Sequence, residues 1–260
     1  MNDTDFFSGQ VVDTPTAREF TERALERISQ EELGGIADLL DQKVLAFRSI
    51  LAEESIGAMT ETQAVGLLRS VFASRRRHHT ILDALTLGGF VEACSGLLYG
   101  TDDAAARLEE FHQVIGGIGR DVPSQVGFDL GSSLLHFTDP ERHWLWTQWM
   151  WDPDHLTGAL PLVLTEDVDL ITDDVAEAYR RIGVATAFIN DVGEAAGFRE
   201  RGHGTLDTDV FLASVYAIYM YTTLRMRMTQ EFNQVVPQLS ELLRRLLGVH
   251  GSTLLKGVAA

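Results

Sequence analysis

The chain has 260 residues, of which 45% are hydrophobic, and 38 acidic against 21 basic side chains give it a formal net charge of -17 at pH 7. So negative a protein repels phosphate backbones and anionic membrane surfaces, which argues against non-specific nucleic-acid binding. The single cysteine, Cys94, excludes an internal disulfide framework and any zinc or iron–sulfur site built on several cysteines.

Two further features favour a soluble, cytoplasmic protein. Residues 1–5 are acidic and lack the basic region of a secretory signal. The longest apolar stretch, from Val210 to Leu224, is shorter than the roughly 20 residues that a membrane-spanning helix needs. We therefore expect a cytoplasmic location and no membrane partner.

Helix signals recur through the first half of the chain. Pro15 after Thr14 predicts a helix from about 14 to 30, and apolar residues at helical spacing predict a second from about 35 to 54. Residues 60–63 read Thr-Glu-Thr-Gln, a capping box in front of a helix with one apolar face. Another helix is expected from about 79 to 99, closed by Gly100, and the acidic residues at 101–103 start the next.

The second half continues in the same way. Asp139 and Pro140 predict the start of a helix that carries the tryptophans, and residues 172–174 that of a helix to about 196. Asp207 or Asp209 opens a long helix to about 232, and Pro237 separates it from a last one to about 247. The best strand candidate, 159–164, contains proline and has no partner, and regions 116–133 and 152–171 are expected to be irregular.

The stretch from Val210 to Leu224 leaves no polar face, which is typical of a helix enclosed by others. The sequence therefore predicts an all-α fold, a single-domain helical bundle of about eight to ten helices over residues 1–260. Its central helix is the all-apolar one near 209–232. Division into an N-terminal subdomain, 1–115, and a C-terminal subdomain, 116–260, is the alternative.

All four tryptophans lie in residues 142–151, which read RHWLWTQWMW. On a helix, Trp144 and Trp151 would share one side, with Trp146 and Trp149 roughly opposite. Burial in the core explains most such side chains, but tryptophan and arginine are also enriched in binding interfaces and stack on planar or cationic ligands. We expect one face to bind a partner or ligand. The candidate residues are Arg142, His143, Trp144, Trp146, Trp149 and Trp151.

A basic run stands out in this acidic chain. Arg75, Arg76 and Arg77 precede two histidines and could bind an anion, a phosphate or an acidic partner. The alternative is a solvated helix end whose positive charges favour the helix dipole.

Metal candidates are few. Glu109 and His112 form a Glu-x-x-His pair, but di-iron bundles need two such pairs and two further carboxylates, and the chain has one pair. His203 precedes Asp207 and Asp209, which could hold a cation with it, although helix capping explains both aspartates. We retain Glu109, His112 and His203 as metal candidates and predict no cofactor.

One stretch resembles a known family. Gly116-Gly117-Ile118-Gly119-Arg120, followed by residues 131–137, looks like the hairpin of helix-hairpin-helix DNA glycosylases over about residues 112–147. The resemblance implies a phosphate held by backbone N–H groups of the turn and a catalytic aspartate, for which Asp139 has the nearest spacing. The chain departs from the family at Pro123, where a helix is expected, and it lacks the accompanying lysine nucleophile.

The sequence signatures of P-loop nucleotide hydrolases, HExxH metalloproteases, GxSxG hydrolases and dinucleotide-binding proteins are absent. We therefore predict a non-catalytic binding or assembly protein that acts through its aromatic segment, with a protein partner or self-association as a homo-oligomer. A planar small molecule is the other partner considered. The alternatives are a helix-hairpin-helix nucleic-acid enzyme, a metal-dependent helical-bundle enzyme and a regulator that binds a small ligand.

Overall fold

The computed structural model describes residues 6–7, 9–199, 202–227, 237–251 and 254. Over these residues the protein is all-α, as predicted, with nine α-helices and no strand beyond two isolated bridges. The helices are α1 (Thr14–Leu25), α2 (Gln30–Leu51), α3 (Glu61–Arg69), α4 (His78–Tyr99), α5 (Ala104–Gly116), α6 (Gln125–Thr138), α7 (Val175–Asp191), α8 (Thr205–Arg227) and α9 (Leu239–Leu246), with short 3-10 helices at Ile56–Ala58 and Leu160–Leu162.

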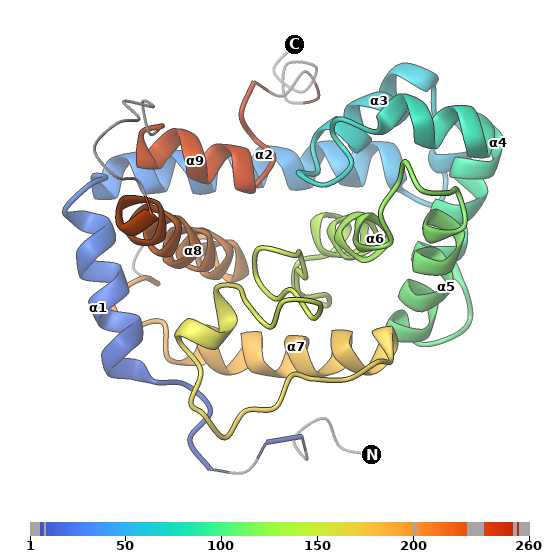
Figure 1. Ribbon diagram of the computed structural model, residues 1–260. Coiled ribbons are helices and arrows are strands. Elements are labelled where there is room, and N and C mark those ends of the chain that lie inside the picture. The colour runs from blue at the N-terminus through green and yellow to red at the C-terminus, as the bar shows by residue number, and fades with distance from the viewer. Residues whose placement is uncertain (1–5, 8, 200–201, 228–236, 252–253, 255–260) are drawn as a thin grey trace.

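Two helices lie at the centre of the bundle, α8 and α6 (Figure 1). α8 packs against α1, α2, α7 and α9, and α6 packs against α2, α4 and α5. The expectation of a central apolar helix is confirmed for α8, whose predicted end near 232 lies outside the described residues. The second central helix, α6, was expected to be irregular over its first half, and that expectation is wrong. The strand candidate at 159–164 is also wrong, because it forms a 3-10 helix.

Most helix starts follow the local signals in the sequence. Thr60 and Gln63 form the expected reciprocal capping box of α3, Asp103 caps α5, and Asp174 caps α7. Because a cap satisfies backbone N–H groups that have no partner inside the helix, short polar motifs fix these boundaries without help from the rest of the fold.

α4 is the one helix among the described residues whose length and composition would allow it to cross a membrane, and 22% of its apolar window is buried in the protein. Thr86 interrupts this helix with a non-helical backbone (φ 61°, ψ 165°). Each half is therefore shorter than the roughly 20 residues of a membrane span.

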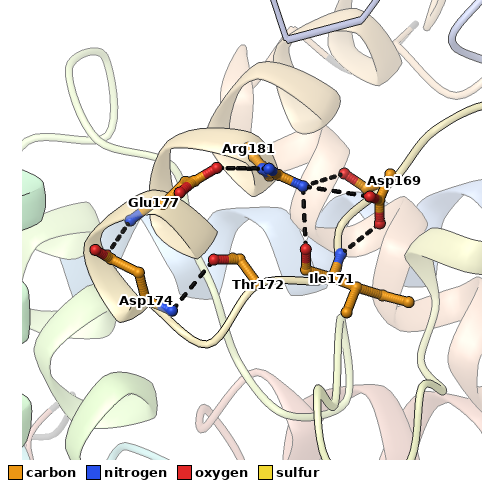
Figure 2. A network of polar contacts seen from close by, with 6 residues as sticks. All are labelled: Asp169, Ile171, Thr172, Asp174, Glu177 and Arg181. Atoms are coloured by element: carbon orange, nitrogen blue, oxygen red, sulfur yellow. Dashed lines mark hydrogen bonds and ion pairs between the residues drawn. The ribbon is translucent and has the colours of Figure 1, made fainter.

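The irregular segment before α7 is held by a polar network, shown in Figure 2. Arg181 of α7 donates to the carbonyl oxygens of Asp169 and Ile171 at 3.1 Å and also pairs with Glu177 one turn earlier. Asp174 accepts the N–H of Glu177 at 2.8 Å. One arginine thus joins the start of a helix to the end of the predicted irregular region 152–171.

The tryptophans lie in an irregular loop, so the prediction of a helix beginning at Asp139 and Pro140 is wrong. α6 ends at Thr138, and Asp139 is the C-cap of that helix rather than the N-cap of a new one. From there residues 139–152, here called the aromatic loop, run back along α6.

Polar side chains of α6 explain why this loop is buried without being a helix. Every residue of α6 from Val126 to Phe137 is buried, including four polar ones. Three of them bond the backbone of the aromatic loop: His136 the carbonyl of His143 (2.7 Å), Ser132 both backbone groups of Trp146 (N–H at 3.1 Å), and Asp129 the N–H of Gln148 (2.7 Å). Because buried backbone groups need partners, this polar stripe replaces the bonds that a helix would make internally.

Candidate ligand pocket

The candidate site is a cavity of about 480 Å³ enclosed by α6, α8, α9, the aromatic loop and the turn between α3 and α4. Its volume is typical of small-molecule sites, which measure roughly 300–1,000 Å³. Two groups of predicted binding residues, which are far apart in the sequence, line this one cavity: Arg75–Arg77 and Trp149.

The three arginines form one wall, which we call the arginine rim (Arg75, Arg76 and Arg77). Among the described residues none of them forms an ion pair with a carboxylate. The Arg75 guanidinium lies 4.2 Å from the centre of the Phe72 ring. Burial, and then repulsion from Arg76 and Arg245, lowers the pKa of Arg75. The rim is therefore a cluster of like charges without a counter-ion, although the protein as a whole carries an excess of acid.

Two carboxyl groups also line the cavity, Asp129 of α6 and Asp152 at the end of the aromatic loop, and we call them the acidic wall. Gln148 lies between them, because its backbone N–H donates to Asp129 Oδ1 at 2.7 Å and its Nε2 donates to Asp152 Oδ2 at 3.0 Å. Burial raises the pKa of Asp129 to about 8, with the charge of Asp152 adding to the rise and the Gln148 N–H opposing it. Asp129 is therefore largely protonated at neutral pH.

Aromatic and apolar side chains complete the cavity. Trp149 and Tyr216 of α8 lie with their ring centres 6.3 Å apart. Trp149 is 4% exposed, and its indole N–H has no acceptor among the described residues. Burial, and then the neighbouring Tyr219 and Asp152, raises the pKa of Tyr216. The pocket thus combines cations, a hydrogen-bonding acid and an aromatic surface.

The other residues predicted for the aromatic segment do not join this pocket. Arg142, His143 and Trp144 line a separate groove of about 580 Å³ beside α5 and α7, where the Tyr179 hydroxyl donates to the Trp144 carbonyl at 3.1 Å. Burial lowers the pKa of His143 in this groove. The six predicted residues therefore do not form one binding face.

Two tryptophans belong to the core. Trp146 stacks on Phe128 with ring centres 4.2 Å apart and planes 6° from parallel, and its indole N–H donates to the Trp151 carbonyl at 3.1 Å. Trp151 is 4% exposed. Burial in the core, which explains most tryptophans, therefore accounts for both.

The structure does not bring the three metal candidates together. The His112 ring stacks against Phe128 with centres 6.0 Å apart, and burial lowers its pKa while Glu109 opposes the shift. Among the described residues, a group of metal-ligating side chains close enough to hold an ion occurs around His203 and does not include Glu109 or His112.

The aspartates expected beside His203 are not those that surround its ring. Asp207 accepts the backbone N–H of His203, and Asp209 lies inside α8 rather than capping it. The ring instead pairs with Asp41 (Nδ1 to Oδ2, 2.6 Å) and Asp38 (Nε2 to Oδ1, 3.7 Å) of α2, both exposed. Ion pairing of one imidazole with two surface carboxylates accounts for this cluster, and we assign no metal to it.

The glycine-rich hairpin joins α5 to α6. Gly116 ends α5, Gly117 is its C-cap, and Gly119 has a positive φ of 126° that favours glycine. Pro123 precedes α6, which begins at Gln125. Asp139, the aspartate implied by the helix-hairpin-helix resemblance, is the C-cap at the far end of α6. Duplex binding by this hairpin stays a prediction.

A second buried polar cluster, the His136 network (Lys43, His136 and Asp209), crosses the core between α2, α6 and α8. His136 Nδ1 donates to the His143 carbonyl at 2.7 Å, and its Nε2 lies 2.7 Å from Asp209 Oδ2. A carbonyl oxygen and a carboxylate oxygen are both acceptors, so this geometry favours the imidazolium form of His136, in which both ring nitrogens donate. Burial lowers the pKa of His136, but attraction to Asp209 and these two hydrogen bonds outweigh it, so the pKa is raised.

Lys43 of α2 is a second cation attracted to Asp209, whose Oδ1 is buried without a hydrogen-bond partner among the described residues. Its ammonium donates to the carbonyl oxygens of Ser70 (3.0 Å) and Leu247 (2.9 Å) and lies 3.8 Å from the centre of the Phe137 ring. Burial lowers the pKa of Lys43 to about 7, and attraction to Asp209 opposes the shift. The network ties the ends of α3 and α9 to the core.

Sequence reasoning missed Asp129 and Tyr216 as pocket residues, and it placed Asp152 beside the aromatic residues without naming it as a site residue. A signal for Asp129 was present, because the polar residues of α6 at 129, 132, 133 and 136 recur at helical spacing within an otherwise apolar segment. No motif marks Asp152 or Tyr216, which reach the cavity only through the path of the aromatic loop and the packing of α8.

No known protein family, curated protein or solved structure matches the chain. Its function therefore has to be inferred from the geometry of its pocket.

Proposed function

We propose that this protein is a non-catalytic ligand-binding protein whose cavity takes a small anion with an aromatic or apolar body. The observation that carries the proposal is the arginine rim: three consecutive arginines, none of which pairs with a carboxylate among the described residues, line one cavity with the buried ring of Trp149. The proposal keeps the planar small molecule considered from the sequence and moves its site from the whole aromatic segment to Trp149.

The physical case rests on charge and shape. Arg76 repels Arg75, and neither of them pairs with a carboxylate among the described residues, although ion pairs would be the simplest relief in an acidic protein. Arg77 lines the same cavity and donates to the carbonyl oxygens of Ala73 and Asp121. Guanidinium groups bind carboxylates and phosphates through paired, charge-assisted hydrogen bonds, so Arg75 and Arg76 are the groups best placed to bind an anion. Trp149 and Tyr216 offer aromatic surface to the body of such a ligand.

The test uses 8-anilinonaphthalene-1-sulfonate, a planar aromatic anion whose fluorescence rises when it leaves water. We expect the wild type to bind one molecule. The double variant Arg75→Gln/Arg76→Gln should bind it about tenfold or more weakly, since each lost charge-assisted hydrogen bond contributes about 1.5–3 kcal/mol.

The matched control is Arg18→Gln/Arg23→Gln. It removes the same charge from exposed positions of α1, outside the pocket. The dye also binds partly folded proteins, so the near-ultraviolet circular dichroism of each variant must match the wild type. Equal affinity for the dye in the wild type and in the rim variant, or an equal loss in the control, would contradict the proposal.

Self-association and a protein partner are separate predictions. Native mass spectrometry distinguishes them from ligand binding, because an oligomer at the bare polypeptide mass favours assembly. A monomer that carries an additional organic mass favours the pocket.

A further inference from the structure

The arginine rim and the acidic wall line one cavity without touching each other. Among the described residues no ion pair within 4.0 Å joins Arg75, Arg76 or Arg77 to Asp129 or Asp152. Because both groups line the cavity and do not pair with each other, a molecule with complementary charges can contact both.

The acidic wall has one hydrogen-bonding position open. Asp152 is fully engaged, since it accepts bonds from Gln148, from the His155 ring and from two backbone N–H groups. Asp129 Oδ1 accepts the Gln148 N–H at 2.7 Å, whereas no hydrogen bond to its Oδ2 is found within the described part of the chain. Asp129 lines the cavity and is 1% exposed. A ligand donor would find Oδ2 of Asp129 as its acceptor, with the charge of Asp152 beside it.

We infer that the ligand is amphoteric and carries an anionic group, an ammonium group and a planar apolar body. The anionic group lies at the arginine rim, and the ammonium group donates to Asp129. The planar apolar body lies against Trp149 and Tyr216. This inference rests on the proposed function and deepens it by naming the class of ligand.

Ammonium binding has a measurable consequence for protons. Asp129 faces Asp152 from the aromatic loop, Tyr216 from α8 and the arginine rim from the α3–α4 turn, while α9 contributes leucines. Burial raises the pKa of Asp129 to about 8, so the group is mostly neutral at pH 7. An ammonium group favours the carboxylate, and the Asp129 proton then passes to the buffer. Binding should therefore release close to one proton.

Three probes that share one aromatic body separate the contributions of the two charged groups. L-Tryptophan carries both charged groups, indole-3-propionate lacks the ammonium group, and tryptamine lacks the carboxylate. Each competes with 8-anilinonaphthalene-1-sulfonate for the wild type at pH 7. We expect tryptophan to displace the dye at a concentration at least tenfold below that of either analogue.

Two variants and one calorimetric readout complete the experiment. Asp129→Asn should weaken tryptophan about tenfold and leave indole-3-propionate unchanged, while Arg75→Gln/Arg76→Gln should weaken both. Titration calorimetry in two buffers of different ionisation enthalpy should show proton release with tryptophan for the wild type and none for Asp129→Asn.

The possible failures are distinguishable. If the dye binds at the rim but indole-3-propionate displaces it as well as tryptophan does, the ammonium site is wrong and the proposed anion-binding function stands. The same holds if none of the three probes displaces the dye. If the dye itself does not depend on the rim, both the function and this inference are overturned.

Discussion

Two clusters of buried titratable groups lie seven residues apart on α6, or roughly 10 Å along the helix. At His136 the opposite charges are in contact, since its ring bonds Asp209 directly and Lys43 is anchored by two backbone carbonyls. At Asp129 the opposite charges, those of the arginine rim, line the same cavity and form no ion pair with it.

The difference separates two uses of buried charge. Removing a charge from water costs several kcal/mol, and a partner in the chain must offset that cost. The His136 network finds its partners across α2, α6 and α8, so its charges contribute to the fold. Asp129 instead reduces the cost by staying protonated, and the rim keeps its charge at the edge of a cavity. That arrangement favours the binding of a charged ligand and contributes little to the stability of the fold.

The largest expected effect comes from breaking the His136 network. Asp209→Ala leaves the buried side chains of His136 and Lys43 without their carboxylate. We expect the free energy of unfolding to fall by about 3–5 kcal/mol, as for other buried ion pairs that lose one partner. Urea unfolding followed by circular dichroism measures it.

A surface pair serves as the control for this prediction. Glu19→Ala removes a carboxylate that pairs with Arg23 on α1, where both side chains are more than half exposed. Its cost should stay within about 1 kcal/mol. A similar small cost for Asp209→Ala would mean that the His136 network is not a closed ion-pair cluster.

A smaller loss of folding stability is expected at Gly248, whose backbone lies against the Lys43 end of the same network. Gly248 has a positive φ of 72°, and a Cβ added there would lie 1.7 Å from the Ser70 carbonyl oxygen that accepts from Lys43. Gly248→Ala should cost about 2–4 kcal/mol, from the unfavourable backbone and from displacement of that carbonyl.

Gly251 is a matched control that isolates the cost of the unfavourable backbone conformation. Its φ is 60°, and a Cβ added there meets nothing within 4 Å. Gly251→Ala should therefore cost only about 1–2 kcal/mol. Equal losses in the two variants, measured by urea unfolding, would show that contact with Ser70 and Lys43 does not matter at Gly248.

The sequence predicted the parts of the fold that depend on neighbouring residues. The capping box at Thr60 and the caps at Asp103 and Asp174 are local hydrogen-bond patterns, and each one marks a helix start in the structure. The apolar stretch of α8 also indicated its central position, because a helix without a polar face has to be covered on all sides.

The errors concern residues whose partners are distant in the chain. The aromatic loop has the composition of a helix, but α6 satisfies its backbone instead. Asp209 was expected to cap a helix, and it pairs with His136, 73 residues away. For the pocket, Arg75–Arg77 and Trp149 were each predicted as binding residues, but only the tertiary fold shows that they share a cavity with Asp129.

The last and most gradual effect is the pH dependence of the open cluster, which is given per pH unit. The folded-state pKa of Asp129 is raised from 3.8 to about 8. Between these pH values the folded protein therefore holds one proton more at this site than the unfolded chain, and stability falls as the pH rises. Asp129→Asn removes this titration, while its amide oxygen can still accept the Gln148 N–H. Relative to the variant, the wild type should lose up to about 1.4 kcal/mol of stability per pH unit.

Urea unfolding of both proteins between pH 5 and pH 9 measures this difference, and the subtraction cancels groups that titrate alike in both. The difference in the free energy of unfolding between the two proteins should grow from pH 5 upward and level off above about pH 8. A constant difference would mean that Asp129 is ionised at neutral pH and that its charge is already balanced inside the protein, as at His136. If this difference in the free energy of unfolding grows as expected, saturating L-tryptophan should reduce it. A bound ammonium group would then supply the positively charged partner that Asp129 lacks within the protein.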